Sequence, residues 1–299
     1  MAIIEEMNQF SIRDIENLTG IKAHTIRIWE QRYGILQPKR TDTNIRFYDA
    51  ADLKSALRIA LLNQYGYKIS RIHKMSDVDM NSLINKITDV DFKLQILVNE
   101  MLEATLNLDI DRFEEIITLY IKKYGIENAV EQLIFHYLEK IGLMWMTDRI
   151  FPAQEHLISN VIYRKLSVAI ENLPPKKSDA SPSVLLFLPE GEIHDLGLLY
   201  VHYMLRKLQK DPIYLGPNSP ISEAKFLYEV KKPKYVYVHL TSVAEDFDGS
   251  KYLQKLSKTF PDCTIFISGS MLRTKKYQTV SNMRFLYTLE EVKDILQKI

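Results

Sequence analysis

Apolar residues near the start of the chain recur at the spacing of an α-helix. Ile26, Trp29 and Tyr33 follow one another at intervals of three and four residues, so they predict one apolar face on a short helix. Ser11 and Asp14 have the spacing of a capping box, which predicts that a first helix begins there. A short glycine-containing turn separates the two helices. This layout is typical of a helix-turn-helix, in which the second helix enters the major groove of DNA.

The segment after the second helix predicts a two-stranded wing. Residues 36–48 have short apolar ends around a polar, turn-prone centre, and Asp49 and Asp52 then cap a further helix that includes residues 53–65. Any two short amphipathic helices joined by a glycine turn would give a similar pattern upstream. The wing makes that simpler interpretation less favoured.

Positive charge is concentrated on these same elements. Between Lys22 and Arg46 there are six cations and two anions (Glu30 and Asp42), a local net charge of +4, whereas the whole chain has a formal net charge of +1. A basic surface confined to one helix and the ribbon beside it is typical of a site that binds nucleic-acid phosphates.

The middle of the chain is helical almost throughout. Amphipathic stretches over residues 91–107, 109–123, 126–145 and 152–172 are joined by short connections, which predicts a four-helix-type bundle. Residues 174–182 are rich in proline and small side chains, and they predict a linker.

From residue 183 the hydrophobic pattern changes from the period of helices to that of strands. Short apolar or β-branched runs alternate with helical stretches, which predicts a doubly wound, flavodoxin-like parallel sheet. In such a sheet the ligand crevice lies outside the carboxyl ends of the strands. The predicted strands are residues 184–188, 213–215, 235–240, 264–268 and 285–287, and the predicted helices are residues 196–208, 221–230, 249–259 and 289–299.

The predicted fold class is therefore α plus α/β. We expect a winged helix-turn-helix over residues 1–78, a helical bundle over residues 79–173, a linker over residues 174–182 and an α/β domain over residues 183–299. The composition of the 299 residues, 46% apolar and 26% charged, is that of an ordinary globular protein.

Cysteine usage and the absence of long apolar runs indicate a cellular location. The single cysteine, Cys263, excludes an intrachain disulfide and fits a reducing compartment. No run of about 18 apolar residues predicts a transmembrane helix. Glu5 and Glu6 argue against a secretion signal at the N-terminus. We expect a cytoplasmic protein with no membrane attachment.

The N-terminal stretch resembles the winged helix-turn-helix of MerR-family transcriptional regulators. The resemblance rests on residues 26–30, 32–34, 36–38 and 46–48, within residues 9–75. It implies that the partner is double-stranded DNA and that Ile26, Trp29 and Phe47 are core residues, but phosphate contacts do not tell which bases are read. The DNA-facing residues that it implies are Arg13, Arg27, Arg32, Tyr33, Lys39, Arg40, Arg46 and Tyr48.

The loop after the first predicted strand of the α/β domain contains a histidine between acidic residues. Glu192, His194 and Asp195 precede Gly197 in this loop. A neutral imidazole is a good metal ligand, and a neighbouring carboxylate can hold its other ring nitrogen. A glycine lets a bulky planar ligand approach the backbone closely. The alternative interpretation is an ordinary surface histidine in a loop.

This spacing resembles the Asp/Glu-x-His-x-x-Gly loop of cobalamin-binding domains, which implies that His194 would coordinate the cobalt of cobalamin. In the bundle, Trp145 followed by Glu155 and His156 resembles the pattern that covers the upper face of adenosylcobalamin in CarH-type regulators. Ordinary bundle core for the tryptophan and a solvated helix start for the other two remain open as alternatives. The implied cofactor-binding residues are Trp145, Glu155, His156, Glu192, His194, Asp195, Gly197, His239, Thr241 and Gly269.

The order of the three predicted domains resembles that of the CarH/LitR light-responsive repressors over essentially the whole chain. It implies that adenosylcobalamin is the cofactor and that the protein forms a homo-oligomer, either a dimer or a tetramer. Assembly of the oligomer would then control operator binding, and light would reverse it, because linked modules bind DNA at high effective concentration.

Three positions depart from that family's pattern. Met146 stands where a histidine directly after the tryptophan would supply a second cobalt ligand. His239 stands where a serine is expected beside the nucleotide tail of the cofactor, and Ser270 replaces the second of two paired glycines. These departures leave a cobalamin-independent regulator, which would use a protein partner or constitutive oligomerisation, as an alternative function.

A cobalamin-dependent enzyme or methyl carrier is a third alternative. With Cys263 as its only cysteine, the chain has no zinc–thiolate cluster, and it has no predicted barrel for a substrate. That function would also leave the basic N-terminal module unexplained. We therefore expect a transcriptional regulator that acts as a repressor, rather than an enzyme.

Overall fold

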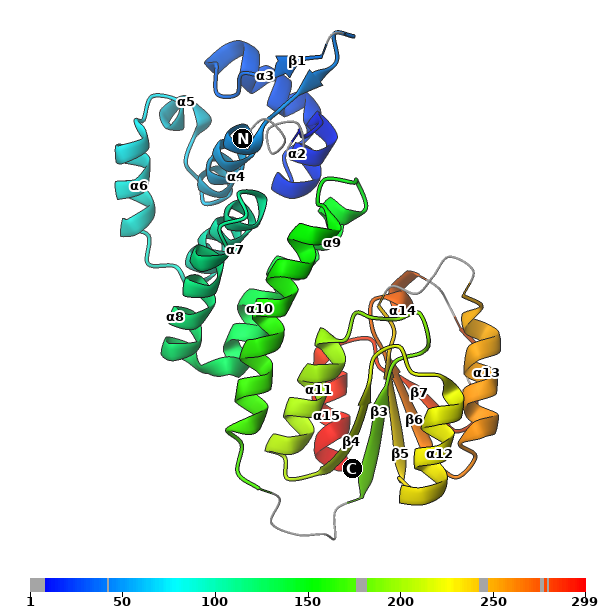
Figure 1. Cartoon of the computed structure of the whole chain (residues 1–299). Coiled ribbons are helices and arrows are strands. Elements are labelled where there is room, and N and C mark those ends of the chain that lie inside the picture. The colour runs from blue at the N-terminus through cyan, green and yellow to red at the C-terminus, as the bar shows by residue number, and fades with distance from the viewer. Residues whose placement is uncertain (1–8, 42, 176–181, 242–246, 275–276, 279) are drawn as a thin grey trace. The chain divides into compact units, whose positions relative to one another are not determined.

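The computed structural model describes residues 9–41, 43–175, 182–241, 247–274, 277–278 and 280–299. The chain forms two compact units, Met1–Val161 and Ile162–Ile299, and each is described by itself (Figure 1). Asp42 and residues 176–181 of the predicted linker lie outside the described residues.

The first unit begins with the predicted helix-turn-helix and wing. Helix α2 (Ile12–Thr19) starts at the capping box, in which the Asp14 amide donates to Ser11 and the Ser11 amide donates to the Asp14 carboxylate. Gly20 ends α2 at φ 74°, a left-handed conformation that glycine adopts without strain. Helix α3 (Ala23–Tyr33) then leads into the antiparallel pair β1 (Lys39–Arg40) and β2 (Arg46–Phe47), which forms the wing.

Helices make up the remainder of the first unit. They are α4 (Ala50–Gln64), α5 (Ile69–Ile72), α6 (Asp77–Lys86), α7 (Val90–Leu106), α8 (Ile110–Asn128), the π-helical turn η1 (Ala129–Ile134), α9 (Phe135–Trp145) and the start of α10 (Pro152–Glu171).

The four predicted bundle helices are present, with shifted bounds. Gly125 interrupts the helix at φ 84° and ψ 165°, as the sequence indicates. The single helix predicted over residues 126–145 is divided by the π-helical turn. In this turn each backbone hydrogen bond joins residues five apart rather than four apart. Side chains such as Phe113 and Tyr137 are fully buried in the bundle, and Tyr137 shares a hydrogen bond of 2.6 Å with Thr105.

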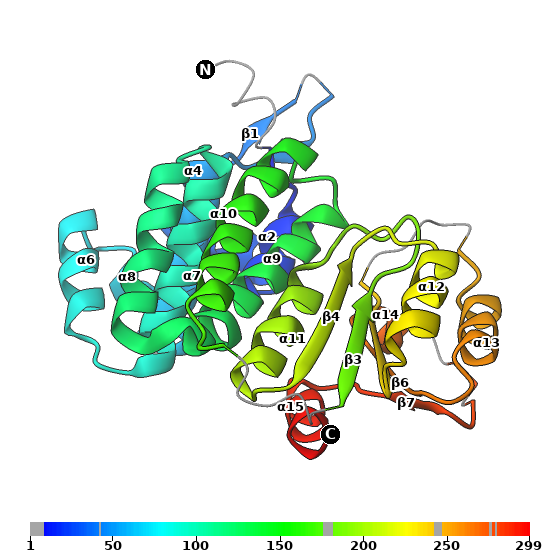
Figure 2. The same cartoon turned by 60° about the horizontal axis from the view of Figure 1, so that its bottom comes forward.

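The second unit is a five-stranded parallel sheet covered by helices. Its strands are β3 (Ser183–Phe187), β4 (Asp211–Gly216), β5 (Tyr235–His239), β6 (Thr264–Ser268) and β7 (Met283–Phe285), in the spatial order β4-β3-β5-β6-β7. Helices α11 (Leu196–Lys207) and α15 (Leu289–Lys298) cover one face, and α12 (Ile221–Lys231) and α13 (Gly249–Thr259) cover the other (Figure 2). The short helix α14 is Met271–Thr274.

This strand order is the flavodoxin-like order that the sequence predicts. The order reverses between β3 and β5, so the crevice expected at a switch point lies at the carboxyl ends of these two strands. The last strand ends at Phe285, two residues before its predicted end, because the amide of Tyr287 already donates to Glu291 in the start of α15. Among the described residues, we find no helix long and apolar enough to cross a membrane.

Candidate functional site

Helix α3 exposes its arginines and buries its apolar face. Ile26 is buried, whereas Arg27 and Arg32 are exposed on the same helix. Tyr33 is partly buried, with its ring centroid 4.9 Å from that of His73. On α2, Arg13 is also exposed. These four residues therefore leave cationic and aromatic groups at the surface of the helix-turn-helix.

Two exposed cations of the wing have defined positions. Lys39 forms a 2.9 Å ion pair with Asp49, at the start of α4. Arg40 donates to the carbonyl and side-chain oxygens of Asn44 at 3.2 and 2.7 Å, which closes the turn between the strands. Because these groups are exposed, their present partners can be exchanged for phosphates at low cost.

Tyr48 is the exception among the predicted DNA-facing residues, and its assignment to that surface is wrong. Its side chain is 0% exposed, and its hydroxyl donates to the carboxylate of Glu30. Backbone bonds between Phe10 and Tyr48 place it in the core between the N-terminus and the wing. Burial and the neighbouring carboxylate both raise the pKa of the Tyr48 hydroxyl, so it stays a neutral donor.

Two structural contacts in this unit have no local signal in the sequence. Glu30 accepts the Tyr48 hydroxyl and lies 3.9 Å from Arg46, so it joins α3 to the wing. Arg149, in the turn between α9 and α10, donates to the buried carboxylate of Asp14 at 2.8 Å. Because 135 residues separate this pair, only the tertiary structure reveals that the turn contacts the first helix of the DNA-binding module.

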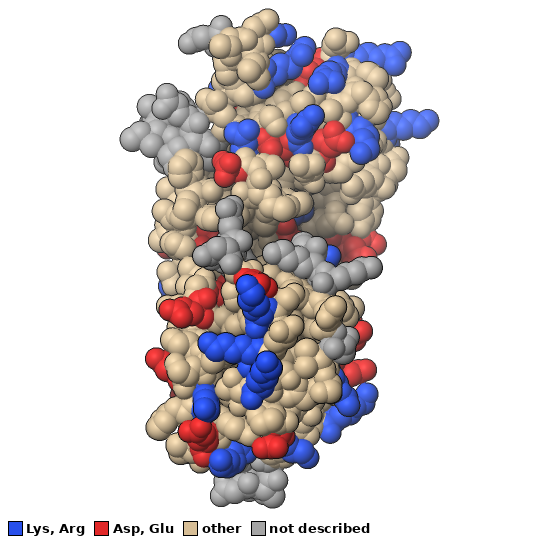
Figure 3. Space-filling view, turned by 90° about the vertical axis from the view of Figure 1, so that its right-hand side faces the viewer, with Lys and Arg blue, Asp and Glu red and all other residues tan. Residues whose placement is uncertain are grey.

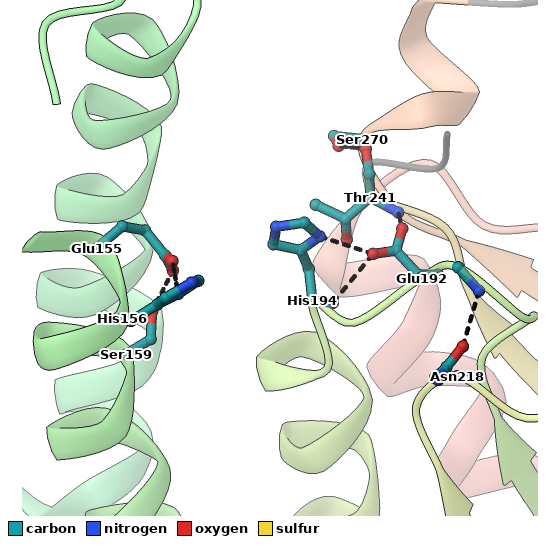
Figure 4. Close-up of polar contacts among 9 residues, drawn as sticks. Glu155, His156, Ser159, Glu192, His194, Asn218, Thr241 and Ser270 are labelled. Atoms are coloured by element: carbon teal, nitrogen blue, oxygen red, sulfur yellow. Dashed lines mark hydrogen bonds and ion pairs between the residues drawn. The ribbon is translucent and has the colours of Figure 1, made fainter. Parts of the chain in front are cut away.

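In the second unit, a buried carboxylate organises the histidine loop. The Glu192 side chain is 0% exposed, and its Oε1 lies 2.7 Å from His194 Nδ1 and accepts the His194 amide at 3.0 Å (Figure 4). Its Oε2 accepts the amide of Thr241 at 3.0 Å. One carboxylate thus joins the loop after β3 to the loop after β5.

The two ring nitrogens of His194 have different roles in this arrangement. The carboxylate holds Nδ1, so Nε2 is the atom with which the ring would bind a metal. The side chain is 41% exposed, which leaves the ring accessible to a ligand. The loop therefore has the chemistry of a single imidazole donor that is oriented by a buried acid.

Asp195 makes a contact with the sheet. Its carboxylate accepts the hydroxyl of Tyr214, on β4, at 2.9 Å. Burial raises the pKa of the Asp195 carboxyl. We conclude that Asp195 anchors the start of α11 to β4.

His239 fills the space beside Gly197. A Cβ atom placed on Gly197 would lie 2.4 Å from Nε2 of His239, so the ring packs directly on the glycine backbone. His239 Nδ1 is 2.8 Å from the hydroxyl of Ser268, which also hydrogen-bonds Tyr237 at 2.6 Å. Burial lowers the pKa of the His239 imidazole to about 4, so the ring is neutral near pH 7.

Gly269, which precedes the departure at Ser270, is closely approached by the backbone of Leu240, whereas Ser270 itself is exposed. Gly269 adopts φ +112°, and a Cβ atom there would lie 2.1 Å from the carbonyl oxygen of Leu240. The hydroxyl of Ser270 donates to the carbonyl of Thr241 at 3.1 Å. Both His239 and Ser270 therefore make internal hydrogen bonds, but only His239 fills space beside the loop.

The bundle residues singled out in the sequence lie at its surface. Trp145 is 45% exposed and Met146 is 74% exposed, so the interpretation of Trp145 as ordinary core is wrong. Glu155 lies 2.8 Å from Nδ1 of His156 and accepts the hydroxyl of Ser159 (Figure 4). These residues offer an aromatic ring and an imidazole to a ligand.

Comparison with known proteins agrees with this architecture. Residues 10–78 match the family model described as MerR HTH family regulatory protein, and residues 97–170 match the model described as B12 binding domain. The chain therefore combines a MerR-type helix-turn-helix with a B12-binding domain.

Relatives extend the similarity over most of the chain. The HTH-type transcriptional repressor CarH of Myxococcus xanthus is 25% identical over 274 residues, which cover 89% of this chain and 90% of that protein. The repressor CarA of the same organism is 25% identical over 211 residues, which cover 70% of this chain and 68% of CarA. This protein is homologous to both repressors.

A solved structure supports the fold. The monomethylamine corrinoid protein of Methanosarcina barkeri is 14% identical and gives a TM-score of 0.52, covering 68% of this chain and 98% of that one. The similarity shows a common fold over the part of the chain that is covered.

Proposed function

We propose that this protein is a DNA-binding transcriptional repressor whose bundle and α/β domain sense a cobalamin. The buried Glu192 carboxylate that orients His194 is the observation that carries the effector part of this proposal. The cations of the helix-turn-helix and wing, all exposed except the partly buried Arg46, support the DNA part of the proposal: Arg13, Arg27, Arg32, Lys39, Arg40 and Arg46. Tyr33 lies beside them and would contact the sugar–phosphate backbone.

The donor set of the loop fits the lower face of a cobalamin. The cofactor would supply a cobalt ion, and Nε2 of His194 would be the nitrogen that binds it. Glu192 would hold the ring in the required tautomer, as second partners of metal-bound histidines commonly do. Trp145, Glu155 and His156, at the surface of the bundle, are the other residues that the resemblance assigns to the cofactor.

The space for a nucleotide tail fits less well. In the domains that the loop resembles, a serine at the position of His239 lines the pocket for the tail, and here the ring of His239 occupies that position and packs on Gly197. A tail could enter only after this ring leaves its hydrogen bond with Ser268. This observation favours the second candidate function, a regulator of the same architecture that acts without cobalamin.

An absorption spectrum distinguishes the two candidates. The full-length protein is mixed with adenosylcobalamin in the dark, desalted and measured in the visible range. We expect the protein to retain the cofactor bands and to lose them in His194→Ala, while His136→Ala, which removes an exposed histidine of α9, retains them. Absence of bands on the unchanged protein would remove the cobalamin-sensing function and leave the second candidate.

The finer part of the proposal concerns assembly. We propose that adenosylcobalamin favours a tetramer and operator binding, and that light reverses both, because several linked modules bind one duplex more tightly than a single module does. Size-exclusion chromatography in the dark, with and without cofactor and after illumination, measures this directly. An oligomeric state that stays the same in all three samples would contradict it.

The DNA part is tested with a mixed-sequence duplex over a series of salt concentrations. We expect binding that weakens as salt increases, because phosphate contacts release counterions. Arg27→Gln with Arg32→Gln on α3 should weaken it, whereas a matched pair on the bundle surface, Lys93→Gln with Lys122→Gln, should not. A protein that shows no salt-sensitive binding would contradict the whole proposal.

A further inference from the structure

A second concentration of positive charge lies far along the sequence from the helix-turn-helix. Four lysines, from α12 and α13 of the α/β unit, line an open groove of about 400 Å³. We refer to it as the lysine groove. Figure 3 shows Lys and Arg side chains gathered on this face of the unit. The residues that line the groove are Lys225, Lys251, Gln254, Lys255, Lys258 and Thr259.

The sequence of α13 places three of these lysines on one side of the helix. Lys251, Lys255 and Lys258 are four and three residues apart, so their side chains share a face and span about 10 Å along the axis. Like charges at this spacing repel each other, and α13 contains no acidic residue to offset the repulsion. The helix therefore maintains a cationic face that its own stability does not require.

Few carboxylates neutralise the lysine groove. Lys251 pairs with Asp248 at 3.2 Å and Lys225 pairs with Glu229 at 3.6 Å, and both pairs are well exposed. Lys255 and Lys258 have no carboxylate partner within ion-pair distance among the described residues. Exposed pairs contribute little free energy, so an incoming anion can replace them.

The chemistry of the lining favours one class of partner. The residues that line the groove are lysine, glutamine and threonine, without an aromatic or large apolar side chain. A small-molecule site or a protein interface needs such apolar anchors. Lysine is a flexible point charge that suits the evenly spaced phosphates of a nucleic-acid backbone.

We propose that the lysine groove is a second DNA contact, which binds the phosphate backbone of the duplex without reading its sequence. This inference rests on the proposed DNA-binding function, and it adds that the α/β unit itself contributes to affinity. Each protomer would then hold DNA through the helix-turn-helix, which selects the site, and through α13, which adds only electrostatic affinity.

The test measures the salt dependence of DNA binding by the full-length protein. The groove variant carries Lys251→Gln, Lys255→Gln and Lys258→Gln. The control variant carries the same change in charge on three scattered exposed lysines, Lys93→Gln, Lys122→Gln and Lys298→Gln. Binding to a mixed-sequence duplex is followed by fluorescence anisotropy, and circular dichroism verifies that each variant is folded.

We expect the slope of log K against log salt to become shallower by about 2–3 in the groove variant, because each lost phosphate contact removes about 0.9. The control variant should change the slope by less than about 1. Equal slopes in the two variants would overturn the second contact and leave the proposed function intact. An unchanged protein that does not bind the duplex would overturn both.

Discussion

Among the residues that the structure describes, two Glu–His pairs place a carboxylate against Nδ1 of an imidazole, and they differ in how the carboxylate is held. The separation is 2.7 Å for Glu192 and His194 and 2.8 Å for Glu155 and His156. Glu192 is fully buried and accepts two backbone amides besides the ring, whereas Glu155 is 19% exposed and accepts a serine hydroxyl.

The difference shows which of the two imidazole rings is held in one orientation before a ligand binds. A buried carboxylate with three donors has one favourable position, so the ring that it holds is oriented in advance. A surface pair is screened by solvent and contributes little to holding a side chain in one place. We infer that His194 is oriented for metal binding before the ligand is present. The side chains of Glu155 and His156, in contrast, can change conformation when a ligand binds.

The largest expected effect comes from removal of the two acids. Glu192→Ala leaves the amides of His194 and Thr241 without their acceptor, so we expect the free energy of unfolding to fall by about 3 kcal/mol. Glu155→Ala should lower it by less than about 1 kcal/mol. Urea denaturation followed by circular dichroism measures both. Equal losses would contradict the contrast between a buried and a surface pair.

Removal of the two imidazoles separates their roles toward the cofactor. We expect His194→Ala to weaken cobalamin binding by about 100-fold or more, since it removes the proposed metal donor, and His156→Ala to weaken it by about tenfold or less. Titration by visible absorption gives both constants. If His156→Ala had the larger effect, the cobalt ligand would have to come from the bundle.

The buried imidazole of His239 should make the stability of the protein depend on pH. His239 is held neutral in the folded protein with a pKa of about 4, below the ordinary value of 6.5, so the unfolded chain binds more protons between these values. Stability is therefore full above about pH 6.5 and decreases as the pH falls toward about 4.

The loss between pH 7 and pH 5 should be up to about 2 kcal/mol larger in the unchanged protein than in His239→Ser. Urea denaturation at the two pH values gives this difference, and His156→Ala serves as the exposed-histidine control. The same serine variant should bind cobalamin more tightly, because it opens the space beside Gly197. An identical pH dependence in the two proteins would show that His239 is not the buried group responsible.

The smallest expected effect on stability is at the exposed tryptophan of the bundle. Trp145→Ala should lower the free energy of unfolding by less than about 1 kcal/mol, because the ring is 45% exposed. Its neighbour Met144 is 1% exposed, and Met144→Ala should cost about 2–5 kcal/mol. For cobalamin retention we expect the opposite order, with a larger loss in Trp145→Ala than in Met144→Ala. A large stability loss in Trp145→Ala would make this residue part of the core after all.

Local features of the sequence were sufficient to predict most of the architecture. The capping box at Ser11, the helix break at Gly125 and the strand at residues 264–268 depend on interactions between near neighbours, so a one-dimensional pattern reveals them. The position of the histidine loop also follows from local order, because a loop after a buried parallel strand must lie at the carboxyl edge of the sheet.

Contacts between distant segments were decided by the tertiary structure alone. The burial of Tyr48 against Glu30, the pair of Arg149 with Asp14 and the packing of His239 on Gly197 join residues that no periodicity relates. The sequence by itself determined the order and approximate extent of most helices and strands, since those preferences are local. Which side chain fills the space beside the loop, and which carboxylate holds each donor, depended on long-range packing, because burial and hydrogen-bond partners exist only once the chain has folded.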